Sequence, residues 1–253
     1  MLTIDAAWAV GIALAVIRAG AFAAASPILA KVMPRMARGA FAIAVSLAIA
    51  RPVAHVPELG GLIGAAGVNL AVGLVLAFVS GLPFYAFDVA GSVTEIGAGL
   101  SAAQVLDPAG SHTSGVLSGM FNMAALAILL AVGGDRVIVQ GIARSVDVIP
   151  LLGVAKMPGD LAKMVVDSVG SLMVSGLELA APVMAALFLA DLGLAALARF
   201  SPQSNAFLIG LPAKILVTFL LLGAVVAIFP GAVHQTLDAV ARAFGEALHG
   251  MAP

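Results

Sequence analysis

The chain has 253 residues, of which 62% are hydrophobic and only 10% charged; its net charge is −1 and its mean hydropathy is +1.15. Because soluble domains carry about 25% charged residues, this composition excludes an ordinary water-soluble fold. The near-neutral charge argues against a nucleic-acid partner, and the absence of cysteine excludes disulfides, thiolate metal sites and cysteine nucleophiles.

Long apolar stretches recur along the chain. A helix needs about 20 mainly apolar residues to cross a bilayer, and four stretches meet that length. They are residues 6–30, 62–87, 165–190 and 207–229. Shorter or more polar stretches occupy residues 40–50, 116–133 and 137–154. The apolar runs are continuous rather than alternating, so we predict an all-α membrane protein with kinked and broken helices, and not a β-barrel.

Charges near the ends of these stretches predict their orientation. The first stretch lacks a basic leader and is longer than the core of a signal peptide, so we expect it to be retained. Lys31, Arg35 and Arg38 fall in one predicted loop around Pro34. Because cytoplasmic loops are rich in cations, we expect this loop in the cytoplasm and the N-terminus outside.

Glycine is dense between residues 60 and 110. Small residues let helix backbones approach closely in lipid, where no hydrophobic force draws helices together. A single glycine indicates no more than ordinary packing. Their density predicts either unusually tight packing or a backbone that departs from regular helix in this part of the chain.

Five charged residues fall inside the apolar stretches or at their edges. They are Arg18, Asp88, Glu95, Glu178 and Asp191. A charge at the centre of a bilayer costs about 2.5–3.5 kcal/mol on insertion scales, so such residues are functional candidates. One interpretation is a proton or ion relay. The other is pairing between helices, or contact with partner subunits and water, which we favour because the five are expected on four different segments.

No catalytic or metal centre is indicated. The four histidines are not paired at the spacing of metal ligands. Ser114 and Ser118 lie near His112, but no arrangement typical of a catalytic triad is visible. The glycine-rich run 60–67 lacks the lysine of a P-loop. We therefore predict a non-enzymatic protein without a metal or cofactor.

Residues 106–123 form the most unusual segment of the sequence. It combines turn formers, glycines and hydroxyl side chains with flexible methionines. The residues that we single out are Asp107, Pro108, Gly110, Ser111, His112, Gly115, Val116, Leu117, Met120 and Phe121. Non-helical backbone at membrane depth is tolerated only when protein buries it or when it lines a water-filled cavity. The segment is therefore either an aqueous loop or an element that enters a pore, where methionines would form an adaptable seal.

A short polar turn joins two apolar helices in the C-terminal half. Pro202 fixes the turn, and Asn205 is placed to cap the second helix. Pro212 lies inside that helix and is expected to kink it. The residues that form the tip of this predicted hairpin are Arg199, Pro202, Gln203, Asn205, Phe207, Pro212 and Lys214. Its cations predict contact with a cytoplasmic partner.

The tip resembles the signature of the FliR family, which has an arginine, a Pro-Gln-x-Asn-x-Phe turn and then Pro-x-Lys. In this chain the signature runs from Arg199 to Lys214, with Ser204 where the family has methionine or leucine. Arg18, the glycine-rich run around Glu95 and the element from Ser145 to Pro150 resemble other parts of the family. The resemblance covers essentially the whole chain.

The resemblance implies a subunit of the flagellar type III protein-export gate, in the bacterial inner membrane and the flagellar basal body. Such a gate contains FliP and FliQ, meets FlhB and FlhA, and translocates unfolded flagellar proteins. Residues 1–160 would resemble a FliP subunit and residues 161–253 a FliQ hairpin, within one membrane domain of antiparallel helical hairpins. A plug of the closed channel would lie within residues 107–122. The resemblance also allows the gate to sit above the plane of the bilayer.

Three alternatives stay open. The homologous gate of a virulence injectisome is in the same class, and neighbouring genes would separate it from the flagellar gate. A small-molecule or proton-coupled transporter predicts inverted repeats and charged residues that converge at mid-membrane. No such repeat is visible in the sequence. A purely structural membrane scaffold predicts that changes in residues 107–122 leave permeability unchanged.

Overall fold

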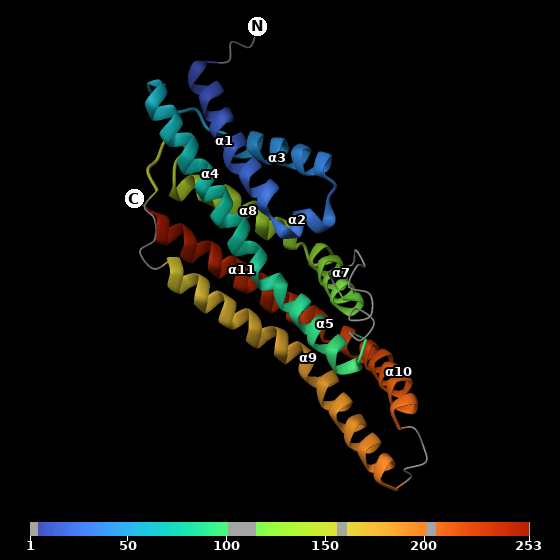
Figure 1. The fold of residues 1–253 in the computed structure, drawn as a ribbon. Coiled ribbons are helices and arrows are strands. Elements are labelled where there is room, and N and C mark those ends of the chain that lie inside the picture. The colour runs from blue at the N-terminus through green and yellow to red at the C-terminus, as the bar shows by residue number, and fades with distance from the viewer. Residues whose placement is uncertain (1–4, 101–114, 156–160, 201–205, 253) are drawn as a thin grey trace. The chain divides into compact units, whose positions relative to one another are not determined.

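The computed structural model describes residues 5–100, 115–155, 161–200 and 206–252, and these residues are almost entirely helical (Figure 1). The prediction of an all-α membrane protein is confirmed. In chain order the helices are α1 (Ala6–Ala25), α2 (Pro27–Val32), α3 (Arg35–Ile49), α4 (Leu59–Gly81), the 3-10 turn η1 (Leu82–Phe84), α5 (Tyr85–Ala98), α7 (Val116–Ala131), α8 (Gly134–Val148), α9 (Leu161–Phe200), α10 (Ala206–Val226) and α11 (Phe229–Met251).

Within the described residues, three helical stretches are long and apolar enough to cross a membrane: Ala6–Ala25, Leu59–Ala98 and Val165–Phe200. α7 and α8 pass the same test only when they are taken together as one broken span. The predicted stretch 207–229 corresponds to α10 and the first residue of α11. A shorter apolar helical segment, Gly210–Gly223, lies within α10.

The first predicted stretch is broken at Ser26. Its hydroxyl accepts a hydrogen bond from the Leu29 N–H at 3.4 Å, and Pro27 opens α2. The prediction that the following cations share one loop was wrong, because Lys31 lies in α2 whereas Arg35 and Arg38 lie in α3. Proline has a fixed φ and can stand directly before a helix, so a connection of only two residues suffices here.

The chain divides into two compact units. The first contains Met1–Pro83, Leu130–Asp167 and Thr236–Pro253. In it α1 and α4 run parallel and meet at Gly73, where an added Cβ would lie 2.4 Å from the Arg18 carbonyl oxygen. Only a residue without Cβ allows this approach. Gly60, Gly64 and Gly67, in contrast, have no such neighbour within 4 Å, and all of them lie in regular helix. The glycine density therefore reflects tight packing at particular positions rather than along the whole run.

The second unit contains Phe84–Leu129 and Ser168–Gln235. Its core includes Phe87 of α5, Phe121 of α7 and Phe229 at the start of α11. The rings of Phe87 and Phe229 are stacked with their centroids 5.4 Å apart, and Phe121 meets Phe229 edge-on at 5.2 Å. All three side chains are buried. Such aromatic pairs contribute about 0.5–1.5 kcal/mol beyond the burial of their area, so they fix three elements distant in sequence against one another.

Candidate functional site

Glu95 holds both flanks of the segment that the sequence singles out. At the end of α5, Gly99 has a left-handed φ of 78°, and the Leu100 N–H donates to the Glu95 carbonyl oxygen at 3.1 Å. At the start of α7, the Val116 N–H donates to Oε1 of the Glu95 side chain at 3.3 Å. The end of α5 and the start of α7 are therefore both hydrogen-bonded to Glu95. Residues 101–114 lie outside the described part of the chain.

Gly115 makes this contact sterically feasible. A Cβ at Gly115 would lie 1.7 Å from Oε2 of Glu95, so any larger residue would displace the carboxylate or the start of α7. Glu95 is only 4% exposed. The first N–H groups of a helix lack intrahelical partners and carry a partial positive charge. A buried carboxylate at this position both satisfies a donor and complements that charge.

The anchor continues as a direct contact between α5 and α7, which run antiparallel here. The Ser118 hydroxyl donates to the Asp88 carbonyl oxygen at 2.9 Å and lies 2.7 Å from the Ser92 hydroxyl. Gly91 lets the two backbones approach, because an added Cβ there would lie 2.4 Å from the Cα of Ser118. These contacts fix the start of α7 relative to α5 along two turns.

The structure redistributes the residues predicted to form the plug loop. Val116, Leu117, Met120 and Phe121 lie in α7 rather than in a loop. Leu117 and Phe121 are buried, whereas Val116 is 69% exposed and Met120 43% exposed. Asp107, Pro108, Gly110, Ser111 and His112 lie outside the described residues. The predicted role of the segment as a plug stays a prediction.

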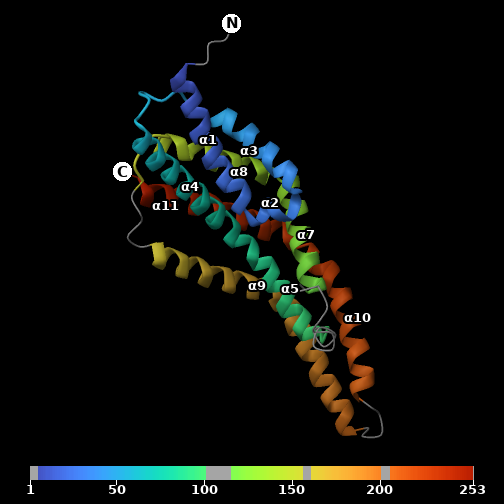
Figure 2. The ribbon, with the colours of Figure 1, turned by 45° about the horizontal axis from the view of Figure 1, so that its top comes forward.

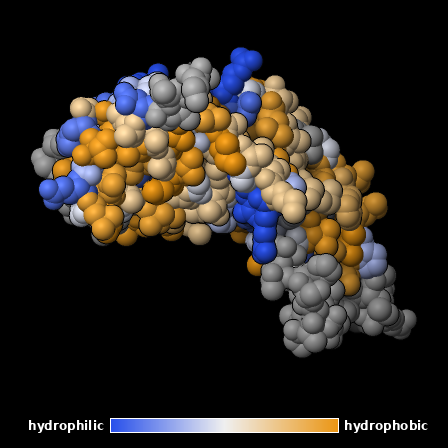
Figure 3. All heavy atoms as spheres, turned by 90° about the horizontal axis from the view of Figure 1, so that it is seen from above, coloured by the Kyte–Doolittle hydropathy of each residue, from blue (hydrophilic) through white to orange (hydrophobic). Residues whose placement is uncertain are grey.

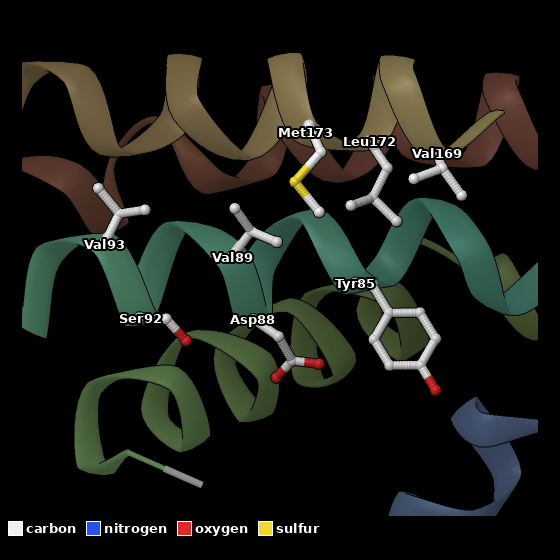
Figure 4. Close-up of a pocket in the computed structure, with 8 residues that line it drawn as sticks. All are labelled: Tyr85, Asp88, Val89, Ser92, Val93, Val169, Leu172 and Met173. Atoms are coloured by element: carbon white, nitrogen blue, oxygen red, sulfur yellow. The ribbon is translucent and has the colours of Figure 1, made fainter. Parts of the chain in front are cut away.

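A hollow of about 420 Å³ lies between α5 and α9 (Figure 4). Its lining residues are Tyr85, Asp88, Val89, Ser92, Val93, Val169, Leu172 and Met173. Val89 and Val93 face the α9 residues, whereas Asp88 and Ser92 extend from the opposite side of α5 (Figure 4). Its lining is mainly apolar, which is typical of a packing defect between two membrane helices rather than of a site for polar chemistry.

The predicted C-terminal hairpin is present as α9 and α10, which lie side by side in both ribbon views (Figures 1 and 2). They run antiparallel, since Gly210 packs against Leu194 and Lys214 forms an ion pair with Asp191. Lys214 is mostly buried, with 20% of its side chain exposed. Its predicted contact with a cytoplasmic partner stays a prediction, but the structure provides a partner within the hairpin.

Other tip residues are only partly described. Arg199 is exposed near the end of α9, and Pro212 lies inside α10, whose helix continues from Ala206 to Val226. Phe207 belongs to the first turn of α10. Pro202, Gln203 and Asn205, including the predicted cap, lie outside the described residues.

Arg18 is the centre of a polar node in the first unit and is completely buried. Its guanidinium donates to Asn69 Oδ1 at 2.9 Å, to the Ser145 hydroxyl at 3.1 Å and to the Ile149 carbonyl oxygen at 2.9 Å. Asn69 in turn donates to the Leu151 carbonyl oxygen at 2.8 Å. The node thus joins α1, α4 and the turn after α8 through neutral acceptors. It also explains the serine at position 145, whose hydroxyl accepts a hydrogen bond from Arg18.

Sequence reasoning missed Asn69 and did not connect Arg18 with Ser145. A polar amide in the middle of the apolar α4 was the available signal for Asn69. The five charged candidates lie on three helices, α1, α5 and α9, and not on four segments. Arg18, Glu95 and Asp191 each bind a different partner in a different place. Within the described residues this arrangement favours pairing between helices over a relay.

Known proteins share this sequence over most of its length. The chain matches the family described as bacterial export proteins, family 1, over residues 9–240. It is 33% identical over 153 residues to the flagellar biosynthetic protein FliR of Bacillus subtilis, covering 60% of this chain and 59% of the relative. It is 30% identical over 154 residues to the surface presentation of antigens protein SpaR of Shigella flexneri, and the match covers 61% of this chain and 59% of the relative.

A longer match of lower identity extends to FliR of Caulobacter vibrioides, with 26% identity over 195 residues, which cover 75% of this chain and 77% of the relative. The match to the Bacillus subtilis and Shigella flexneri relatives spans only about three fifths of their length. The family match, in contrast, takes in α1, the Arg18 node, the Glu95 anchor and the α9–α10 hairpin. The chain therefore belongs to the bacterial export proteins of family 1, the family of FliR.

Proposed function

We propose that this chain is a subunit of a type III protein-export gate of the flagellar kind, located in the bacterial inner membrane and basal body. In this proposal it forms part of a channel wall together with FliP-like and FliQ-like subunits, and its cytoplasmic ends meet FlhB and FlhA. The cargo is unfolded flagellar protein. The observation that carries the proposal is the family match over residues 9–240, together with FliR relatives from several bacteria.

The large uncovered apolar surface supports a role in an assembly. Only 17% of the apolar window in Val165–Phe200 is buried, and large apolar residues such as Phe188 and Leu189 are more than 60% exposed. Apolar side chains cover much of the face shown in Figure 3. Extensive exposed apolar surface marks contact with lipid or with other proteins.

The Glu95 anchor supports a plug within residues 107–122. In this proposal the segment closes the channel at rest, and its two ends are held by the backbone and the side chain of one residue. Closing a loop at its base lowers the entropy that the intervening residues lose when they become ordered.

Deletion of the gene in its own bacterium tests the function. We expect loss of swimming and of secreted filament protein, with both restored by the wild-type gene supplied in trans. A deletion strain that still secretes filament protein and swims normally would contradict the flagellar role.

The second candidate is an export gate of a virulence injectisome. It is favoured by the relatives named surface presentation of antigens protein SpaR and Yop proteins translocation protein T, the latter 27% identical over 160 residues. The same deletion strain separates the two. Loss of effector secretion with normal swimming would assign the chain to an injectisome.

A further inference from the structure

α9 presents two opposite faces in the second unit. One face is packed, and its buried residues are Leu172, Gly176, Ala180, Val183 and Leu187. At about 100° per residue, Glu178 lies on the opposite face. Its neighbours on that face are Ser171, Val174, Ser175, Ala185 and Leu189, and all of them are exposed. The carboxylate therefore extends away from the rest of the unit, among apolar and small side chains.

Glu178 stands near the middle of the longest part of α9 that is otherwise free of charged residues. Asp167 and Asp191 bound this part, and Glu178 is the one charged residue between them. The 23 residues between the two aspartates have a helical length of about 35 Å, close to the thickness of a bilayer core. Within the described part of the chain, the Glu178 side chain forms no ion pair and no hydrogen bond.

Pro182 adds a second acceptor at the same place. A proline has no N–H, so the carbonyl oxygen four residues earlier, that of Glu178, loses its helical donor. The Glu178 carboxylate and the Glu178 carbonyl group are thus both without a donor within α9. Lipid cannot supply one, and an unsatisfied polar group in hydrocarbon costs several kcal/mol.

We propose that a helix of a different membrane subunit covers this face and inserts a lysine or arginine side chain at Glu178. A cation with several N–H groups can neutralise the carboxylate and donate to the carbonyl oxygen. The small residues Ser171, Ser175 and Ala185 let a second helix approach closely. This inference rests on the proposed role as a subunit of an assembly, and it adds the surface and the chemistry of the partner.

A second copy of this chain fits the face less well. Among the described residues, the cations inside α1, α4, α5, α9 and α10, away from their ends, are Arg18 and Lys214, whereas Arg136, Arg144 and Arg242 lie in the amphipathic α8 and α11. Arg18 is buried in its own polar node, and Lys214 is paired with Asp191. Neither is available to another copy without breaking an existing contact. Lipid alone fits worse still, because it would leave a carboxylate at membrane depth without a counter-charge.

Photo-cross-linking in intact cells tests the proposal. A benzoylphenylalanine residue replaces Ala185, two turns from Glu178 on the same face, in the full-length chain expressed from its own locus. We expect an adduct with a different membrane protein. The adduct should be about tenfold weaker in Glu178→Arg, and a reversal of the captured protein's lysine or arginine to glutamate should restore it. Asp167→Asn, at the polar end of the same helix, is the matched control and should leave the adduct unchanged.

Each outcome decides the matter. The inference would be overturned if no adduct forms or if the adduct contains a second copy of this chain. It would also be overturned if the yield of an adduct with another protein is the same with and without Glu178. If Glu178→Arg does not accumulate, Glu178→Gln removes the charge with little change in size, and an unchanged adduct in that variant overturns the inference as well. Swimming is scored separately in every strain. Normal swimming without an adduct refutes this inference and leaves the proposed function intact. An adduct that is restored by charge reversal, in a bacterium that secretes filament protein without the gene, refutes the proposed function and leaves this inference intact.

Discussion

The side chain of Glu95 accepts a hydrogen bond from the backbone N–H of Val116, 21 residues later in the chain, at 3.3 Å. The backbone carbonyl oxygen of the same glutamate accepts a hydrogen bond from the Leu100 N–H. The residues on both sides of segment 101–114 are thus bonded to Glu95. A buried carboxylate at a helix N-terminus is a strong acceptor, since a hydrogen bond to a charged group contributes about 1.5–3 kcal/mol. Glu95 therefore bonds both the end of α5 and the start of α7.

Gly115→Ala should weaken this base. The added Cβ would lie 1.7 Å from the Glu95 carboxylate, so either the carboxylate or the start of α7 must shift and the bond to Val116 is lost. We expect faster potassium efflux from resting cells, with the protein still present in the membrane. The control is Gly119→Ala in the same helix, where an added Cβ would have no neighbour within 4 Å. Equal efflux in the two variants would show that the Glu95 anchor does not restrain a plug.

Asn69→Ala should lower the thermal stability of the purified protein. The variant removes the acceptor of one Arg18 N–H and the donor to the Leu151 carbonyl oxygen, both in the buried node. A buried polar group without a partner costs about 1–3 kcal/mol. In a chain of this size each kcal/mol corresponds to about 2–4 °C in melting temperature. Ser171→Ala, at an exposed site on α9, serves as the reference, and an equal melting temperature would mean that the node contributes little.

Gly73→Ala should disrupt the packing of α1 on α4. The new methyl group would lie 2.4 Å from a backbone oxygen of α1, which cannot move aside as a flexible side chain can. Overpacking of this kind costs about 1–3 kcal/mol. Gly64→Ala in the same helix adds the same methyl group in open space and raises helix propensity. We expect lower yield and melting temperature for Gly73→Ala only; similar losses in both variants would point to a general intolerance of α4.

Reversing the charges of the ion pair between Asp191 and Lys214 distinguishes a structural role of the lysine from contact with a partner. If Lys214 mainly fixes the hairpin, Lys214→Glu should reduce export, and the double variant Asp191→Lys with Lys214→Glu should restore it, because the pair is re-formed with reversed charges. If Lys214 instead contacts a cytoplasmic partner, the double variant should stay defective. Filament protein in the culture medium is the measurement. We expect at least partial rescue.

The sequence was sufficient for the fold class and for most helices, because continuous apolar runs are typical of membrane helices. α11 was missed because its apolar residues are spaced along one face and not gathered in one run. Val233, Leu237, Val240 and Phe244 follow the spacing of an amphipathic helix, and all are buried. A search for helical periodicity, rather than for mean hydropathy alone, would have found it.

The candidate site was only partly predictable. The sequence singled out Arg18, Glu95 and Asp191 as charged residues in or beside apolar stretches, which follows from the cost of burying charge, and it singled out Lys214 as part of the hairpin tip. Which residue each one binds depends on how distant helices pack. Ser145 lies 127 residues from Arg18, and no local pattern relates the two. The apolar stretch 116–133 matches α7 closely, but Val116 to Phe121 were also assigned to a candidate loop, since glycine and serine near a helix N-terminus are equally typical of a loop.

The central claim is that this chain supplies a plug to a protein-export channel, and ion leak through the resting membrane tests it most directly. Cells carrying a deletion of residues 107–113, which leaves Gly115 and the start of α7 intact, are compared with wild-type cells for potassium efflux while the protein level is followed by immunoblot. The account predicts a marked increase in efflux at an unchanged protein level, reversed when the wild-type gene is restored. Wild-type efflux from cells that contain the shortened protein in a fully assembled complex would contradict it.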